Sequence, residues 1–182
     1  PMFHVNAWGF PFAATAAGAG HVYPGPSPDP ADIATLVETE GVTFAAGVPA
    51  VWLGLVEHAE DNDVDLSTLE TIAVGGSAAP ESMLRWFDDR GVEVVHAWGM
   101  TEVSPIGTVA RLKHGLGEDY EAELERRGKQ GLVLPGLEMR VVDGDGGAVP
   151  WDGESFGELW VRGPWVTTEY FGRPETDDAE FE

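Results

Sequence analysis

The sequence lacks cysteine altogether and contains only two lysines, Lys113 and Lys129. Without cysteine, this stretch has no disulfide, no thiolate metal ligand and no thiol nucleophile, which is neutral to mildly favourable for a reducing cytoplasm. No apolar run approaches the roughly 18 residues of a membrane-spanning helix, and no charged and apolar leader with a cleavage site is visible. These absences give no support to a membrane span or to export, and we expect a cytoplasmic protein.

Positive charge is scarce as a whole, because 10 basic residues stand against 32 acidic ones and the formal net charge is -22. Without a basic patch to release counterions, nucleic acid and anionic membrane surfaces are poor partners. Yet 43% of the residues are hydrophobic and seven are tryptophan, which predicts a folded core under an acidic surface instead of a disordered tail. A lysine-poor acidic surface favours a salt-loving source, where molar salt shortens the Debye length to about 3 Å. An acidic mesophilic protein is the alternative.

Helix-like and strand-like segments alternate through the first part of the chain. Residues 1–20 predict a buried, alanine-rich helix that ends at Gly18 or Gly20, and residues 21–24 predict a short strand. The later segments are a helix between Asp29 and Gly41, strands at 42–46, 71–74 and 92–95, and helices from Pro49 and from Pro80 to Arg90. This alternation predicts an α/β fold with a parallel sheet and right-handed crossovers.

After Pro105 the pattern changes toward strands and turns. A helix is expected at 118–127, and strands at 137–142, 157–163 and 166–171, with the turn DGDGG at 143–147. We therefore expect an α/β subdomain over 1–128 and a mostly-β annex over 129–182. Asp143, Asp145 and Glu154 occupy calcium-loop positions, but Gly147 and Ala148 break that motif, so a hairpin turn is the preferred interpretation.

Other patterns predict packing. In the helix from Pro49, a core stripe is formed at helical spacing by Trp52, Leu53, Val56 and Ala59. His4 and Trp8 are four residues apart and would share a helical face, which by spacing alone indicates two core residues. Three histidines have no partner at metal-ligand spacing and are expected to be structural or at the surface: His21, His58 and His114.

Two loops at the ends of successive strands carry the residues best suited to a ligand. The strand at 71–74 is followed by Gly75, Gly76, Ser77, Ala78 and Ala79, and then by Pro80 at a helix start. Such a turn brings the backbone close to a ligand and leaves amides free for acceptor atoms. No lysine follows, so this is not a Walker loop, and the dinucleotide G-x-G-x-x-G is absent. A tight structural turn is an equal alternative.

The strand at 92–95 leads to a loop formed by Trp98, Gly99, Met100, Thr101 and Glu102. These residues offer a flat ring, a close backbone approach, a hydroxyl and a hard oxygen ligand, which together suit a magnesium nucleotide. Because successive parallel strands end on one rim of a sheet, the two loops should meet there. Taken alone, the second loop would be an ordinary strand exit.

Five segments together resemble the adenylate-forming superfamily, and within it the fatty acyl-CoA synthetases. They are PMFHVNAW, AGVPAVW, VGGSAAP, HAWGMTE and GELWVRGPWV, in the family's order over essentially the whole chain. The resemblance implies an internal fragment of the large N-terminal domain, from a haloarchaeal source by its acidity. The implied activity is adenylation of a fatty acid by ATP with Mg²⁺, followed by transfer of the acyl group to coenzyme A.

The resemblance also implies a role for each site residue. Gly75, Gly76, Ser77, Ala78 and Ala79 would form a wall of the adenine pocket, and Trp98, Gly99, Met100 and Thr101 would hold the rest of AMP. Trp98 stands where the family commonly has tyrosine, so it keeps a flat face and lacks the hydroxyl. Thr101 would bind the α-phosphate and Glu102 the magnesium ion. His4 would lie beside the acyl carboxylate, Trp8 would gate the acyl tunnel, and Gly47 would line it.

Several family elements are missing from this stretch. They are the phosphate loop with its lysine, the Arg-Thr-Gly-Asp segment and the mobile C-terminal domain with its catalytic lysine. We therefore expect a fragment that is inactive alone, and a possible homodimer in the full-length enzyme through residues before Pro1. The alternatives are another adenylating enzyme (an aryl-CoA ligase, an amino-acid-activating domain or a luciferase-like oxidase) and a non-catalytic nucleotide-binding module. The acyl chain length is not readable from the sequence.

Overall fold

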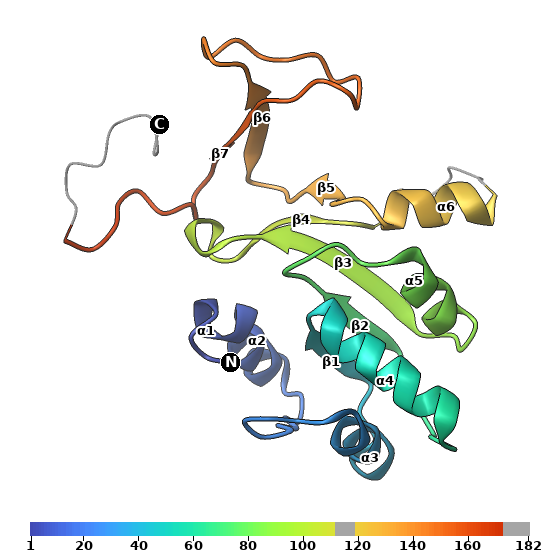
Figure 1. Cartoon of the computed structure of the whole chain (residues 1–182). Helices are drawn as coiled ribbons and strands as arrows, with labels where there is room; N and C mark the ends of the chain where they lie inside the picture. The colour runs from blue at the N-terminus through green and yellow to red at the C-terminus, as the bar shows by residue number, and fades with distance from the viewer. Residues whose placement is uncertain (112–118, 173–182) are drawn as a thin grey trace.

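Three short strands pair in parallel where β-branched and small apolar residues cluster. They are β1 (Phe44–Gly47), β2 (Thr71–Val74) and β3 (Glu93–Gly99), with β2 in the middle. The structure is a computed structural model that describes residues 1–111 and 119–172 (Figure 1). The predicted α/β fold and the strand at 71–74 are confirmed. The strand expected at 92–95 begins one residue later and continues to Gly99.

The prediction of a parallel sheet is confirmed for β1, β2 and β3, but the whole sheet is mixed, because it includes two further strands that were not predicted. β4 (Ile106–Val109) pairs antiparallel with β3, and β5 (Leu132–Val133) pairs antiparallel with β4. The connection at 100–105 is too short for a parallel crossover, which needs about a dozen residues, so the chain must return antiparallel. β5 lies beyond residue 128 and still belongs to this sheet. The division into 1–128 and 129–182 stays a prediction.

The core lies between this sheet and the helices on one of its faces. α4 (Pro49–Asp61) contributes Trp52 and α5 (Glu81–Asp88) contributes Phe87, and their rings meet edge to face at 6.3 Å. Leu53 was expected in this core but is 39% exposed, and Leu55 is fully buried instead. One residue is 100° around a helix, so Leu53 points away from the face that Trp52 occupies, whereas Leu55 lies near it.

α3 (Pro30–Glu40) is bounded as its sequence predicts. The Asp29 side chain accepts a hydrogen bond from the Asp32 amide at 2.8 Å, and Gly41 ends the helix with φ of 62°. A short acidic side chain supplies the acceptor that a helix start lacks, and glycine tolerates the left-handed residue that ends it. The buried side chains of α3 are Ala34 and Val37.

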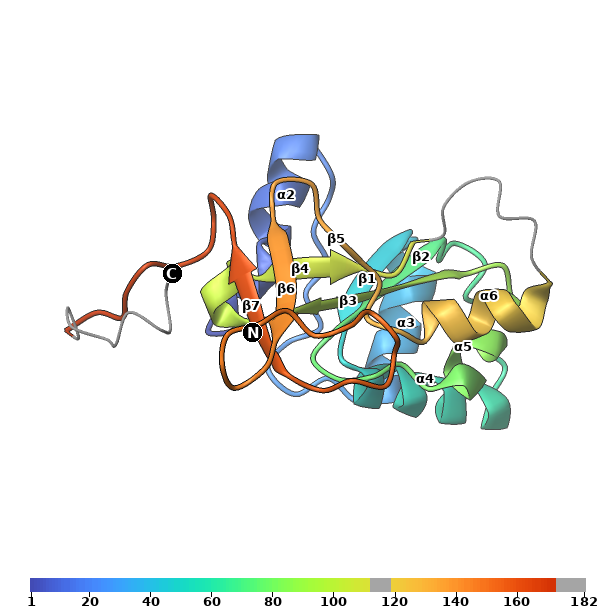
Figure 2. The ribbon, with the colours of Figure 1, turned by 90° about the horizontal axis from the view of Figure 1, so that it is seen from above.

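The N-terminal segment differs from the expected single buried helix. It forms α1 (Val5–Trp8) and α2 (Phe10–Ala17), and neither contains a buried residue. All four residues of α1 have positive φ, so the turn is left-handed and the argument that His4 and Trp8 share a right-handed helical face fails. α2 lies across the sheet from α4 and α5 (Figure 2) and ends before Gly18, as predicted. Residues 21–24 form no strand.

The last described part forms a second, two-stranded antiparallel sheet, set apart from the first (Figure 1). It consists of β6 (Glu138–Val142) and β7 (Glu158–Arg162), close to the predicted positions. At 143–147 the Asp143 carboxylate accepts from two amides of its own turn, those of Asp145 and Gly147, which confirms a tight turn. Within residues 1–111 and 119–172, no group of three or more metal-ligating side chains gathers. The strand expected at 166–171 does not form.

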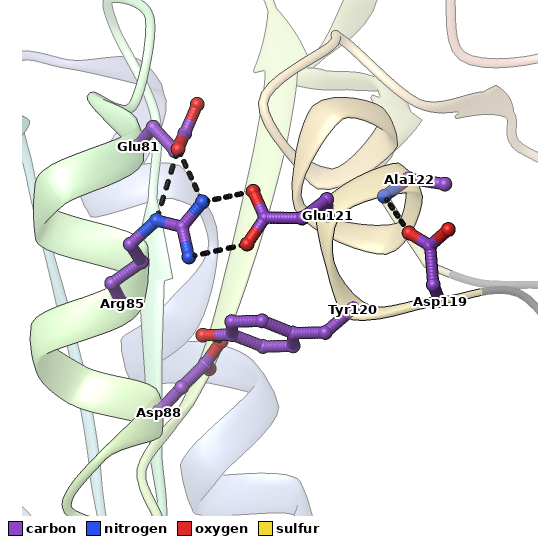
Figure 3. Close-up of polar contacts among 7 residues, drawn as sticks. All are labelled: Glu81, Arg85, Asp88, Asp119, Tyr120, Glu121 and Ala122. Carbon is purple, nitrogen blue, oxygen red and sulfur yellow. Dashed lines mark hydrogen bonds and ion pairs between the residues drawn. The ribbon is translucent and has the colours of Figure 1, made fainter.

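α6 (Tyr120–Arg127) packs beside α5 through charged contacts that Figure 3 shows in part. Arg85 of α5 lies between Glu81 of its own helix and Glu121 of α6, and it lowers the pKa of the Glu121 carboxyl. Arg127 donates to both oxygens of Asp88 at 2.7 and 2.8 Å, which raises the pKa of its guanidinium. The helix start expected at Glu118, and His114, lie outside the described residues. No described helix has the length and apolar character needed to cross a bilayer.

The two ion pairs should contribute unequally to stability. The side chains of Arg127 and Asp88 are 10% and 18% exposed, against 35% and 70% for Arg85 and Glu121. Asp88→Asn should cost about 2 kcal/mol in urea denaturation, because it leaves a mostly buried guanidinium with only the longer contact of 3.7 Å to Glu123. Glu121→Gln is the control and should cost less, since Arg85 is solvated and keeps Glu81. Equal losses would contradict this account.

Candidate functional site

β2 ends at Val74, beside His96, and β3 continues three residues further to Gly99, so the two predicted loops follow strands that end at the same edge of the sheet. Val74 pairs with His96 in register, and a Cβ atom added at Gly75 would lie 3.3 Å from the Ala97 carbonyl oxygen. Gly47, at the end of β1, pairs with Val74 and belongs to the same rim. The prediction that both loops lie at one edge of the sheet is therefore confirmed, and a meeting of the two loops around a ligand stays a prediction.

The glycine loop, residues 75–79, is anchored at both ends and open in the middle. Gly75 and Ala79 are buried, whereas Gly76, Ser77 and Ala78 are exposed. Gly76 has φ of 85°, a conformation that side chains other than glycine rarely adopt, so the turn itself explains this glycine. Residues 76–78 are the part of the loop that a ligand can reach.

The second loop is shorter than expected, because Trp98 and Gly99 belong to β3. The Trp98 ring packs over Gly107 of β4, where a Cβ atom would lie 2.6 Å from it. A Cβ atom at Gly99 would lie only 1.7 Å from the Pro105 carbonyl oxygen. The backbone that comes close to Gly99 is therefore that of Pro105, in the same chain. The stacking of Trp98 on adenine stays a prediction.

After Met100 the chain forms the short 3₁₀ helix η1 (Thr101–Val103), which is anchored by the buried Val103. Thr101 is exposed and Glu102 is half-buried. Glu102 Oε1 accepts a hydrogen bond of 2.6 Å from the Tyr170 hydroxyl, and its backbone carbonyl accepts one of 2.8 Å from the Thr167 amide. The Glu102 carboxylate is therefore oriented by a hydrogen bond from Tyr170, and the preceding residue, Thr101, carries a hydroxyl.

Of the two N-terminal residues predicted for the site, Trp8 contacts the glycine loop and His4 is exposed. The Trp8 ring lies 3.4 Å from where a Cβ atom of Gly75 would be, so Trp8 covers the start of the glycine loop. His4 is exposed and its ring lies 4.7 Å from that of Phe3. Gly47 is backed by Trp52, whose ring nitrogen donates to the Gly47 carbonyl at 3.1 Å. The structure thus brings Trp8 to the loop, and the roles of His4 and Gly47 at an acyl group stay predictions.

Two residues near this rim were missed from the sequence. Tyr170 lay in a segment expected to be a strand, and no spacing connects it with Glu102. His96 is 1% exposed, and its ring nitrogens face the carbonyl oxygens of Ser77 and Lys129. A signal for His96 existed, because the alternation from Val92 and Val94 places it on the buried face of β3.

The steric constraint at Gly99 can be tested directly. Gly99→Ala should lower the free energy of unfolding by about 3 kcal/mol, since the new methyl group meets backbone that must shift. Gly144→Ala is the matched control, because open space surrounds Gly144 and its φ is not positive. Circular dichroism in urea measures both. A Gly99→Ala protein as stable as the control would show that the close approach to Pro105 is wrong.

An α/β sheet with a glycine loop and a hydroxyl-carboxylate turn at neighbouring strand ends is typical of nucleotide-binding proteins. Residues 1–171 match the family model of the AMP-binding enzymes, and the chain belongs to that family. This confirms the superfamily inferred from the five segments. The salt-loving source stays a prediction.

Two curated relatives are fatty-acid ligases by name. The chain is 47% identical over 176 residues to the long-chain-fatty-acid–CoA ligase of Thermus thermophilus, covering 96% of this chain and 32% of the relative. It is 47% identical over 173 residues to the medium-chain-fatty-acid–CoA ligase of Ectopseudomonas oleovorans, covering 94% and 32%. The chain thus spans about a third of the length of these relatives.

Among solved structures, the chain is similar to O-succinylbenzoate coenzyme A synthetase from Bacillus subtilis in complex with ATP and a magnesium ion. The TM-score is 0.78 at 24% identity, over 100% of this chain and 35% of that one. At this identity the similarity shows the shared fold.

Proposed function

We propose that the chain is part of an ATP-dependent fatty acyl-CoA synthetase, an AMP-forming acid–thiol ligase. The observation that carries the proposal is the meeting of three segments at one rim. Trp8 lies on Gly75, Gly75 lies against Ala97 of β3, and Thr101 and Glu102 follow the end of β3 after Met100. The two fatty-acid ligases that are 47% identical to almost the whole chain support fatty acids as substrates.

In the proposed complex the nucleotide lies along this rim. The glycine loop, residues 75–79, takes the adenine side, and Trp98, Gly99, Met100 and Thr101 take the rest of AMP. Trp8 and Gly47 lie toward the acyl chain, and His4 toward its carboxylate. Residues 76–78 and Thr101 are exposed, which supports this arrangement because a ligand can reach them.

The proposed reaction has two steps. A carboxylate oxygen attacks the α-phosphorus of ATP and the bond to the β-phosphate oxygen breaks, which releases pyrophosphate. The coenzyme A thiol then loses its proton and attacks the acyl carbonyl, which releases AMP. Charge builds up on the α-phosphate oxygens in the first step, so a hydrogen bond from Thr101 there stabilises the transition state more than the ground state.

Glu102 is the residue proposed to hold magnesium. Its half-buried carboxylate has Oε1 bonded to Tyr170, and no cluster of metal-ligating side chains surrounds it within residues 1–111 and 119–172. A single carboxylate fits Mg²⁺, which keeps water and substrate phosphates among its ligands. When bound, the ion neutralises part of the phosphate charge. The Tyr170 hydrogen bond keeps the Glu102 carboxylate oriented.

Removal of the Glu102 carboxylate tests the proposed activity. In the full-length ligase, Glu102→Ala should slow adenylation by about 10²-fold, because one preorganised electrostatic contact to the phosphates is lost. Fatty-acid-dependent exchange of pyrophosphate into ATP measures this step alone. Glu93→Ala, at the exposed start of β3, is the control and should keep normal exchange. Near-normal exchange in Glu102→Ala would refute its role, and a wild-type protein without exchange would favour a non-catalytic module.

Substitution of Trp8 tests the proposed position of the acyl chain. Trp8→Ala should relax the preference for acyl chain length or the order of substrate binding, because it removes the ring that covers Gly75. A series of fatty acids of increasing length, with aryl and amino acids added, measures the profile and separates fatty acids from the alternative substrates. Trp151→Ala is the control, since Trp151 is 88% exposed on the β6–β7 connection. An unchanged profile would reduce Trp8 to a packing role.

A further inference from the structure

His96 is a buried polar side chain on an otherwise apolar face of β3. It is 1% exposed, and its neighbours on that face, Val92 and Val94, are each 2% exposed. Nε2 lies 3.2 Å from the Ser77 carbonyl oxygen, and Nδ1 lies 3.1 Å from the Lys129 carbonyl oxygen. A buried polar group destabilises the fold unless it is hydrogen-bonded, so at least one of these two contacts should be a hydrogen bond.

The two acceptors belong to different parts of the chain. Ser77 is the central residue of the glycine loop, and Lys129 follows α6 just before β5. The imidazole therefore links β3 to the loop on one side and to the chain that enters β5 on the other. A neutral ring carries one N–H and can donate to only one of these carbonyls.

The contact with Ser77 sets the direction of a peptide group. In a trans peptide the carbonyl and the following N–H point in opposite directions. With the Ser77 carbonyl directed into the fold toward His96, the amide of Ala78 is directed away from it, toward the exposed side of the loop. The hydrogen bond thus orients a backbone donor in the part of the loop that a ligand can reach.

We propose that His96 is a positioning residue, which donates from Nε2 to the Ser77 carbonyl and so holds the Ala78 amide ready for an acceptor atom of the nucleotide. The loop contact is a property of the fold. The link to nucleotide rests on the proposed function of the site. With the proton on Nε2, Nδ1 presents a lone pair to the Lys129 carbonyl oxygen and makes no hydrogen bond there, so the contact with Lys129 is not part of the proposal.

Glutamine and asparagine separate the two contacts. The side-chain nitrogen of glutamine occupies about the place of Nε2, and that of asparagine about the place of Nδ1. In the full-length ligase, His96→Gln should therefore keep the KM for ATP within about twofold, whereas His96→Asn and His96→Leu should raise it about tenfold. Tenfold is the loss expected for one hydrogen bond. The KM for the fatty acid and kcat should change less than the KM for ATP, as measured by pyrophosphate exchange.

Thr108→Val is the matched control. Thr108 is buried in β4 and donates to the Gln130 carbonyl, next to Lys129, so its removal weakens the entry to β5 without touching the glycine loop. It should lower stability and leave the KM for ATP unchanged. A rise in the KM for ATP equal to that of His96→Leu would show that general loosening, and not the loop contact, is responsible, and would overturn the proposal.

Amide hydrogen exchange without nucleotide gives a readout that does not depend on activity. The peptide covering 75–79 should exchange faster in His96→Asn and His96→Leu than in the wild type and in His96→Gln. If His96→Asn behaved like the wild type and His96→Gln did not, the important contact would be that with Lys129, and the proposal would be refuted. Equal exchange in His96→Gln and His96→Leu would also refute it. If the wild type shows no pyrophosphate exchange, the proposed function fails, and hydrogen exchange still decides whether His96 orders the loop.

Discussion

Close approach of backbone to backbone at the ends of β2 and β3 is the constraint on which the site depends. A Cβ atom at Gly75 would make a tight contact of 3.3 Å with the Ala97 carbonyl oxygen, and a Cβ atom at Gly99 would overlap with the Pro105 carbonyl oxygen. The glycine loop and the turn at Thr101–Glu102 follow strands that end at the same edge of the sheet. The overlap with Pro105 explains why position 99 needs glycine whether or not a ligand is present.

α5 and α6 pack beside each other. Three of the few basic residues make contacts on these helices or directly after α5. Arg85 and Arg127 connect α5 with α6, and Arg90 lies 3.6 Å over the Trp86 ring. α5 begins directly after the glycine loop, and α6 ends just before Lys129, whose carbonyl faces His96. The packing of these two helices therefore bears on the position of the loop through the His96 ring.

Local rules predicted the elements whose determinants lie close together in sequence. Asp29, Pro30 and Gly41 define α3, and the alternation around 71–74 defines β2, because caps and periodicity act within a few residues. The antiparallel return of β4 and the contact between Tyr170 and Glu102 were not predictable in this way, since they depend on pairings between distant segments. The left-handed turn at Val5–Trp8 was not predicted, because three of its four residues are of types that rarely adopt positive φ.

For the site, the sequence predicted which loops meet but not what each residue does there. The contact with Pro105 accounts for glycine at position 99, and the assignment of Gly99 to a nucleotide stays a prediction. His96, left without a role, bonds to the loop. Residue type indicates what chemistry is available, whereas only packing decides whether the neighbour is a ligand or the chain itself.

The charge of the rim limits how it can hold a nucleotide. The two loops, residues 75–79 and 98–102, contain no basic side chain and one carboxylate, within a chain of net charge -22. A triphosphate is repelled by such a field unless local donors and counterions offset it. Backbone amides such as that of Ala78, the Thr101 hydroxyl and a cation at Glu102 are the groups this stretch can offer, and an amide contributes only if its direction is fixed in advance. In a rim without lysine or arginine, the orientation of one peptide group therefore matters more than it would beside a basic side chain.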